Sequence, residues 1–202
     1  MNKRELENGL LKYIPEPTVP LLAAWVIDYN IHLRISRSRS SKLGDYRPPQ
    51  QGHGHRISIN HNLNPYAFLV TLVHEIAHLT CWNSYQNRVE PHGKEWKMEY
   101  QKLMVPVIEL GIFPEDVHLA LMSYLRNPAA SSCTDTQLQK TLSRYDENPV
   151  IHLDDIPEGA RFQLVNGMVM TKGEKRRTRY RCQAEHNQRF YLVSGVAEVE
   201  LL

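Results

Sequence analysis

The sequence predicts an α+β protein with a helical domain and small antiparallel sheet at residues 1–127, a linker at 128–149, and a small β-rich module at 150–202. Three observations predict this organisation. Long segments of the first part repeat apolar residues at helical spacing. Short, partly alternating segments interrupt them around residues 32–60, between Ser, Pro and Gly clusters. An Asn-Gly pair between two alternating segments lies in the last part, and such a pair is a strong hairpin signal.

The first part is predicted to contain five helices and three short strands, with Pro and Gly marking several helix ends. The helices are expected at 2–12, 21–29, 64–85, 92–111 and 114–126, and the strands at 32–39, 44–47 and 56–60. In the last part, the hairpin is expected at 161–172 and further strands at 177–182, 188–193 and 197–201. The segment between the parts is rich in Ser, Thr, Gln and Asn, which favours a linker.

Residues 74–78 read His-Glu-Ile-Ala-His, an H-E-x-x-H motif. Two imidazoles one helical turn apart, His74 and His78, can bind a single ion, and a catalytic zinc takes three protein ligands and keeps a position for water. Glu75 lies on the flank of that helix face, where its carboxylate can take a proton from the metal-bound water. The motif therefore indicates one zinc per chain and the chemistry of a metallopeptidase.

The motif has this meaning only on a helix, and its surroundings predict one. Asn64 is a favoured N-cap and Pro65 a favoured first helical residue. An apolar stripe follows at helical spacing, formed by Leu69, Leu72, Val73, Ile76 and Leu79. Both histidines fall roughly opposite this stripe, which places them toward a cleft. The alternative is a chance match in a chain with ten histidines.

His92 is the candidate third ligand, because it stands at the expected start of the next helix after a connection long enough to fold back. A compact metzincin pattern is excluded, since Cys81 and Ser84 occupy its glycine and histidine positions. A carboxylate ligand from Glu95 or Glu99 stays open. Cys81 also continues the face of the histidine pair, although a buried free cysteine is the commoner situation.

Three sequence elements together resemble the SprT-like family of zincin-type proteins: H-E-I-A-H, the later H-G-K-E-W, and the preceding R-I-S-I-N. The resemblance spans roughly residues 18–126. It implies a zincin-like metalloprotease domain, with His74, His78 and His92 as zinc ligands and Glu75 as the catalytic residue. Because the family includes metalloproteases that cut proteins crosslinked to DNA, it also implies a protein substrate and single- or double-stranded DNA as a partner.

The C-terminal part departs from the family pattern. Many relatives carry a zinc ribbon there, with two pairs of cysteines, whereas this chain has only Cys182 in the corresponding stretch. Cys182 and His186 would make half a metal site, and no second half is visible. The module is therefore expected to resemble a zinc ribbon that has lost most of its cysteines.

The three cysteines, Cys81, Cys133 and Cys182, are too few and too scattered for a disulfide framework, which fits a reducing compartment. The first 11 residues hold no apolar signal region, and no apolar segment reaches membrane-spanning length. We therefore expect a cytoplasmic protein that does not bind membranes, while the oligomeric state stays unknown.

Basic residues gather in two stretches of a chain that carries 24 Lys and Arg against 22 Asp and Glu. The expected nucleic-acid contacts are Arg34, Arg37, Arg39, Lys175, Arg176, Arg177, Arg179 and Arg181. Arg177, Arg179 and Arg181 alternate, so the sequence predicts a ladder on one strand face. The alternative is an edge strand that its charges keep from aggregating.

The sequence leaves two functions to weigh. The first is a zinc metallopeptidase whose extended substrate adds to a sheet edge beside the motif helix, acting on DNA-associated proteins. The second is a nucleic-acid-binding or transcription-associated module with a structural zinc site. An open fourth coordination position favours the enzyme, and a site closed by Cys81 favours the module.

Overall fold

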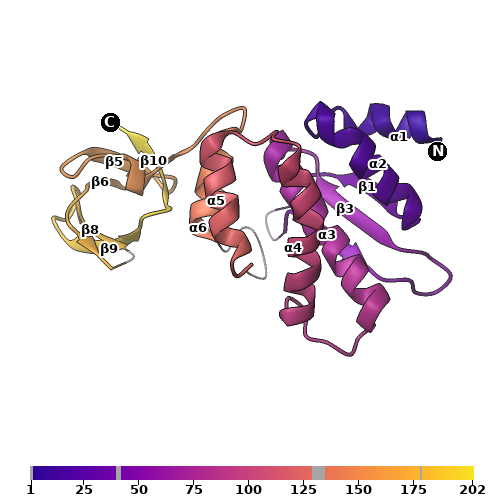
Figure 1. The fold of residues 1–202 in the computed structure, drawn as a ribbon. Helices are drawn as coiled ribbons and strands as arrows, with labels where there is room; N and C mark the ends of the chain where they lie inside the picture. Colours follow the sequence, from indigo (N-terminus) through magenta and orange to yellow (C-terminus); the bar gives the residue numbers. More distant parts are fainter. Residues whose placement is uncertain (1, 40–41, 129–134, 178) are drawn as a thin grey trace. The chain divides into compact units, whose positions relative to one another are not determined.

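The structure is a computed structural model, and it describes residues 2–39, 42–128, 135–177 and 179–202 (Figure 1). The chain forms two compact units, Met1–Asp146 and Glu147–Leu202. The predicted α+β class is confirmed, with six α-helices and two sheets among the described residues. No helix in the described part is long and apolar enough to cross a membrane.

The five predicted helices are present in the first unit. They are α1 (Lys3–Leu10), α2 (Val19–Asp28), α3 (Pro65–Tyr85), α4 (Lys94–Glu109) and α5 (Glu115–Leu125), and a 3₁₀ turn, η1 (Glu16–Thr18), precedes α2. Helix α2 begins two residues earlier than predicted, because Pro20 lies in its first turn, where a missing N–H costs nothing. Asn64 caps α3 as predicted, and its side chain accepts from the N–H groups of Tyr66 and Ala67.

A sixth helix, α6 (Thr136–Ser143), lies where the linker was predicted, so that prediction is wrong for this segment. Leu138 and Leu142, one helical turn apart, are buried in the core of the first unit. The Asn64 amide of α3 donates to the Leu142 carbonyl at 2.8 Å. The segment was predicted to be a linker because of its polar composition, although these two leucines pack it against the core. Residues 129–134, which include Cys133, lie outside the described residues.

The first unit holds a three-stranded sheet of β1 (His32–Ser36), β2 (Gly44–Arg47) and β3 (Arg56–Asn60). The strand order is β1-β3-β2, with β1 parallel and β2 antiparallel to β3. The sheet is therefore mixed: the antiparallel prediction is confirmed for β2 and β3 and wrong for β1, because β3 returns between β1 and the edge strand β2. Sequence neighbours are not spatial neighbours here.

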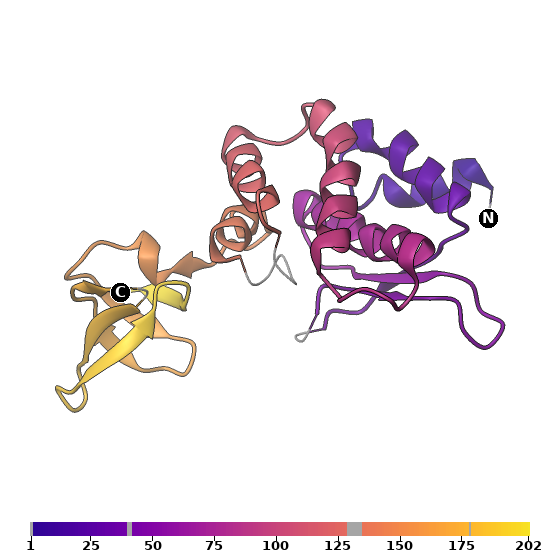
Figure 2. The ribbon, with the colours of Figure 1, turned by 60° about the horizontal axis from the view of Figure 1, so that its bottom comes forward.

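The two faces of this sheet differ sharply. Ile57 and Ile59 of β3 are almost fully buried on the inner face, against which α3 packs. Figure 2 shows the helices of this unit on one side of the three strands. Arg56 and Ser58 alternate with these isoleucines and therefore point to the outer face. The sheet thus separates an apolar interior from a polar surface.

The second unit is a seven-stranded sheet with its own small core. Its strands are β4 (Ile151–His152), β5 (Arg161–Leu164), β6 (Val169–Thr171), β7 (Lys175–Arg176), β8 (Arg179–Ala184), β9 (Phe190–Ser194) and β10 (Glu198–Leu201), and a 3₁₀ turn, η2 (Leu153–Asp155), follows β4. The predicted hairpin is confirmed as β5–β6, with Gly167 at φ +84° in its turn. Cys182 is buried in the core, whereas His186 is exposed.

Candidate metal centre

Helix α3 and the turn before α4 bring three histidines together. His74 and His78 stand one turn apart on α3, and His92 reaches them from the connection between the helices. Each offers a ring nitrogen, and these nitrogens lie within 4.8 Å of one another. The Nε2 atoms of His74 and His92 are 3.3 Å apart. The three predicted ligands therefore form a cluster that could hold a metal ion.

The backbone of the connection places His92. This residue has φ +59°, in the left-handed region that few non-glycine residues adopt, and α4 begins only at Lys94. The N–H of Gly93 donates to the Glu90 carbonyl at 2.9 Å and closes the turn. A Cβ at Gly93 would lie 2.9 Å from the same carbonyl oxygen, so the turn requires glycine. His92 thus belongs to a tight turn rather than to the helix start that was expected.

Trp96 of α4 forms the base of the cluster. Its ring centroid lies 4.6, 5.3 and 4.7 Å from those of His74, His78 and His92. Trp96 in turn stacks on Tyr100, with ring centroids 5.2 Å apart and an interplanar angle of 8°. Both aromatic side chains are almost fully buried. Trp96 therefore packs against the three imidazoles, and the two buried rings shield that side of the site from solvent.

The alternative ligands do not join the cluster in the described part of the chain. Neither Glu95 nor Glu99 contributes a ligand atom, because α4 turns Trp96 toward the histidines. Cys81 is a buried free cysteine and is also outside the cluster. His92 is therefore the third donor that the geometry favours.

Burial keeps the imidazoles neutral. It lowers the pKa of His74 to about 2, with help from the neighbouring His78 and His92, and the pKa of His78 to about 3. Burial also lowers the pKa of His92. Neutral imidazole is the form that binds a metal, so no proton has to leave at neutral pH.

Three buried polar atoms around the cluster have no hydrogen-bond partner among the described residues: His74 Nδ1, Trp96 Nε1 and the Tyr100 hydroxyl. Buried polar groups normally have partners, so three unpartnered atoms beside one cluster set this region apart from an ordinary core. His74 Nδ1 is the ring nitrogen opposite the Nε2 that faces His92. The second nitrogen of a metal-bound histidine usually donates to a further group.

Glu75 lies beneath the edge strand β2. Burial, with a smaller effect from Asp45, raises the pKa of Glu75 to about 8, while a hydrogen bond from the Tyr46 N–H acts in the opposite direction. Gly44 packs directly on this side chain. A Cβ at Gly44 would come within 2.8 Å of Glu75 Cγ and of Thr71 Cγ2, and closer still to Glu75 Oε1. A carboxyl with a pKa near neutrality suits proton transfer.

The other wall of the site contains Tyr46 and His55, which the sequence did not single out. The Tyr46 hydroxyl and His55 Nδ1 are 3.0 Å apart. The Tyr46 ring lies parallel to that of His78, 6.3 Å away, and His55 meets the edge of Trp82 at 5.4 Å. A usable signal was the alternation of β2, which turns Gly44 and Tyr46 toward α3 together.

Comparisons with known proteins fit this site. Residues 26–113 match the model of the SprT-like family. Residues 26–113 therefore form a region similar to a SprT-like domain. This confirms the resemblance drawn from the three sequence elements. All three histidines, Glu75 and strand β2 lie within the matched residues.

Several curated proteins similar to this region carry the name Protein SprT. The one from Escherichia coli O157:H7 is 36% identical over 85 residues, which are 41% of this chain and 47% of the relative. Those from Escherichia coli strain K12 / DH10B and from Shigella boydii serotype 18 are 35% identical over 85 residues, with the same coverage. The match thus spans about half the length of these relatives. No solved structure matches the chain significantly.

The basic residues of the first unit gather on the outer face of the three-stranded sheet. A groove of about 730 Å³ lies there, lined by five arginines: Arg34, Arg37, Arg39, Arg47 and Arg56. The three predicted contacts, Arg34, Arg37 and Arg39, are therefore together. Arg47 and Arg56 were missing from the predicted contacts, although strand alternation could have placed them on this face.

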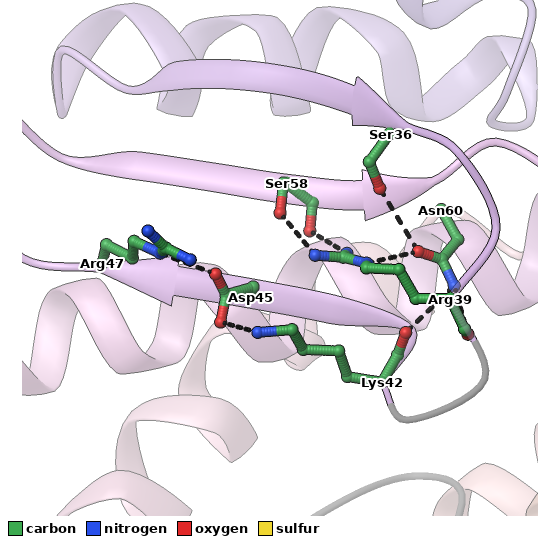
Figure 3. Close-up of polar contacts among 7 residues, drawn as sticks. All are labelled: Ser36, Arg39, Lys42, Asp45, Arg47, Ser58 and Asn60. Atoms are coloured by element: carbon green, nitrogen blue, oxygen red, sulfur yellow. Dashed lines mark hydrogen bonds and ion pairs between the residues drawn. The ribbon is translucent and has the colours of Figure 1, made fainter.

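Figure 3 shows how the polar groups of this face lie. Arg39 crosses toward β3, where it donates to Asn60 Oδ1 at 2.8 Å and to the Ser58 hydroxyl at 3.0 Å. Asp45 lies between Lys42 and Arg47, at 2.6 and 2.9 Å. Arg39 thus fastens the segment after β1, and Asp45 is the one acidic residue lining the groove in the described structure.

The predicted ladder of the second unit is wrong in its geometry. Arg179 and Arg181 are exposed on β8, but Arg177 lies in the turn before that strand, at φ +44°. Lys175 and Arg176 form ion pairs with Asp154 and Glu174, at 3.1 and 2.6 Å. A tight turn between β7 and β8 interrupts the strand, so the three arginines cannot share one face.

Proposed function

We propose that the SprT-like domain is a zinc-dependent metallopeptidase. The observation that carries the proposal is the convergence of three neutral imidazoles beside a buried glutamate on the same helix. Two nitrogens bound at about 2.0–2.1 Å to one tetrahedral zinc lie about 3.3 Å apart. The 3.3 Å between the Nε2 atoms of His74 and His92 agrees with this geometry.

The residues divide the chemistry among them. His74, His78 and His92 would hold the zinc, which when bound would polarise the scissile carbonyl and lower the pKa of a water. Glu75 would accept a proton from the attacking water and deliver it to the leaving amine. Burial raises its pKa to about 8, closer to neutrality than the pKa of an ordinary glutamate, and this supports a role in proton transfer.

Strand β2 supplies a place for the substrate. It is an edge strand, hydrogen-bonded only to β3 among the described strands of its sheet. Its Gly44 and Tyr46 contact Glu75, so its free edge runs past the reacting groups. An extended peptide can add there as a further strand, held by main-chain hydrogen bonds.

The alternative, a structural zinc site, requires a fourth protein ligand. Cys81 was the candidate for this role, and it does not join the histidine cluster in the part of the chain that the structure describes. This arrangement supports a fourth position that is open to water, as catalytic zinc sites have.

Glu75→Gln tests the enzymatic role. The substitution keeps the shape of the side chain and removes the base, so zinc content should stay at one per chain while cleavage of a casein or unfolded-protein substrate disappears. Exposed Glu109→Gln is the matched control and should cleave at the wild-type rate. Unchanged cleavage by Glu75→Gln would contradict the proposal.

We also propose that the arginine groove binds the phosphate backbone of DNA and brings the peptidase to DNA-associated proteins. Arg47 and Arg56 stand directly opposite each other on β2 and β3. Like charges in such pairs repel. Arg56 Nε is also buried without a partner in the described structure. A bound phosphate would offset the repulsion between the arginines and would supply an acceptor for Arg56.

The groove favours contact with phosphates over contact with bases. Among the described residues, its lining contains no Phe, Tyr or Trp ring on which a base could stack. Binding should therefore depend little on base sequence and fall steeply with salt.

Charge reversal at Arg34, Arg47 and Arg56 tests this second proposal. Single- and double-stranded DNA are titrated across a salt series, and each lost phosphate contact should reduce the salt slope by about one unit. The matched control reverses Arg177, Arg179 and Arg181 in the second unit. Wild-type binding by the first triple variant and weakened binding by the second would transfer the site to β8 and its turn.

A further inference from the structure

A small cavity of about 150 Å³ adjoins the histidine cluster. His78 and His92 form one of its walls, so it opens beside the proposed metal position. The residues lining it are Tyr46, Pro48, His78, Cys81, Trp82, Gln86, Asn87, Val89, Glu90, Pro91, His92 and Trp96. They come from the end of β2, the last turns of α3, the connection that follows and the start of α4.

The helix side of the cavity is formed by Cys81 and Trp82. Cys81 and Trp82 stand one turn beyond His78 on α3, and Cys81 is buried without a disulfide partner in the described chain. His55 contacts both Trp82 and the Tyr46 hydroxyl, so it fixes the positions of two aromatic rings. This wall does not have to form when a ligand arrives.

The opposite wall is the connection between α3 and α4. Gln86, at φ +56°, ends α3 with a hydrogen bond from its N–H to the Trp82 carbonyl. The Arg88 N–H donates to the Tyr85 carbonyl at 3.2 Å. Val89 is half-buried and turned toward the cavity, whereas Arg88 is exposed and does not line it. The connection is therefore a structured wall of the cavity.

The size and lining of the cavity select a chemical class. A cavity of about 150 Å³ can hold a group the size of benzene. Aromatic rings, two prolines, Val89 and a buried thiol line it beside the two histidines, and its polar side chains, Gln86, Asn87 and Glu90, are exposed. Its described lining contains no Lys or Arg, so an acidic side chain would lose its hydration there without gaining a basic partner from the walls, which is costly.

We propose that this cavity is the pocket that selects the substrate: it binds an aromatic or branched aliphatic side chain of the residue beside the scissile bond. The inference rests on the proposed peptidase function, because it assumes that the substrate carbonyl lies at the histidine cluster. Sharing His78 and His92 with that cluster places the pocket one side chain away from the reacting carbonyl. Trp82 and Val89 are its specificity-determining residues.

The test measures binding, so that it does not depend on cleavage. Hydroxamates of glycine, alanine, aspartate, leucine and phenylalanine are titrated calorimetrically into the zinc-loaded full chain. All five probes can chelate the zinc, and only their side chains differ. Burying a leucine or phenylalanine side chain is worth about 1.5–3 kcal/mol, so these two should bind about 10- to 100-fold tighter than glycine hydroxamate. Aspartate hydroxamate should bind no better than glycine hydroxamate.

Two substitutions in one connection sharpen the result. Val89→Phe fills the cavity and should abolish the preference for leucine and phenylalanine, whereas Arg88→Phe places the same side chain outside it and should retain the preference. Trp82→Phe enlarges the cavity and should improve binding of tryptophan hydroxamate. Zinc content is measured for every variant, and it should not change.

The outcomes separate this inference from the function beneath it. Equal binding of all the hydroxamates, or an unchanged preference in Val89→Phe, would overturn the pocket even if the chain cleaves proteins. A preference for phenylalanine hydroxamate that Val89→Phe abolishes, in a chain that cleaves no protein, would keep the pocket and overturn the peptidase. If Val89→Phe does not fold, the hydroxamate series and Trp82→Phe still decide.

Discussion

Two carboxylates on opposite sides of strand β2 behave in opposite ways. On the inner side, burial raises the pKa of Glu75 to about 8. On the outer side, partial burial acts to raise the pKa of Asp45, but hydrogen bonds and charge from Lys42 and Arg47 outweigh it and lower that pKa. Asp45 belongs to β2 and Glu75 to α3, and the two carboxylates lie on opposite faces of the strand. The carboxyl with the raised pKa thus lies on the buried face of the sheet, and the carboxylate paired with basic residues lies on the exposed face.

This contrast has an energetic consequence. On the inner face, Gly44, Glu75 and Thr71 are packed so closely that one added carbon has no room. On the outer face, arginine side chains line a wide groove. Single substitutions should therefore have large effects inside and small effects outside, and the predictions below follow that order.

The largest effect is expected for His92→Ala. It removes one of three ligands, and since loss of an outer-shell partner alone costs about 10- to 100-fold in metal affinity, zinc affinity should fall by more than about 100-fold. Competition with a chromophoric chelator measures it. His61→Ala, at an exposed position outside the cluster, should bind zinc like the wild type. Full zinc retention by His92→Ala would remove this residue from the site.

Glu75→Gln should stabilise the metal-free protein at alkaline pH. The ordinary pKa of a glutamate is 4.5, and that of Glu75 in the folded chain is about 8. Between these values the unfolded chain releases the proton that the folded chain keeps, so the folded state loses stability as the pH rises. Glutamine does not titrate and avoids this loss.

The two proteins should therefore have similar free energies of unfolding at pH 5. At pH 8, Glu75→Gln should be more stable by a few kcal/mol, since each pKa unit is worth about 1.4 kcal/mol. Urea unfolding of both proteins in the presence of a chelator checks this. A difference that does not change with pH would show that folding does not raise the pKa of Glu75.

Gly44→Ala should have the next largest effect. Its methyl group would meet Glu75 and Thr71, and overpacking of this kind costs about 1–3 kcal/mol in the free energy of unfolding. Zinc affinity should change little, because no ligand moves. Gly54→Ala is the matched control, since the nearest atom to its new Cβ is 4.0 Å away. Equal stability of the two variants would mean that β2 can move away from α3.

The metal centre was predictable because most of its information is local. His74, Glu75 and His78 lie within five residues on one helix, and the cap at Asn64 defines where that helix begins. His92 required one further assumption, that the next connection folds back. The left-handed backbone that directs His92 toward the other two histidines could not be predicted, because few non-glycine residues adopt that conformation.

The rest of the site depends on tertiary structure. Gly44 and Tyr46 acquire their roles only because β2 is the edge strand beside α3, and the strand order β1-β3-β2 leaves no mark on the sequence. Helix α6 was missed for a similar reason: its two core leucines lie in a polar segment, and only contact with α3 and α5 makes them buried.

The smallest effect is expected on the outer face, for Arg56→Thr. Arg56 stands opposite Arg47, so its removal relieves repulsion, and threonine suits a strand. We expect a change within about 0.5 kcal/mol, favourable at low salt and lost in about 1 M salt, where screening is nearly complete. Arg39→Thr, on the same face, should instead destabilise by about 1 kcal/mol or more, because Arg39 donates to Ser58 and Asn60.

Urea unfolding at several salt concentrations, beside DNA titrations, distinguishes the two arginines. If the groove serves binding, Arg56→Thr should weaken DNA binding and leave the fold slightly more stable, the combination expected of a residue kept for function at a small cost in stability. Arg39→Thr should lose stability whether or not DNA is present. A loss of more than about 1 kcal/mol in Arg56→Thr would make this arginine structural, and the outer face would then resemble the inner one.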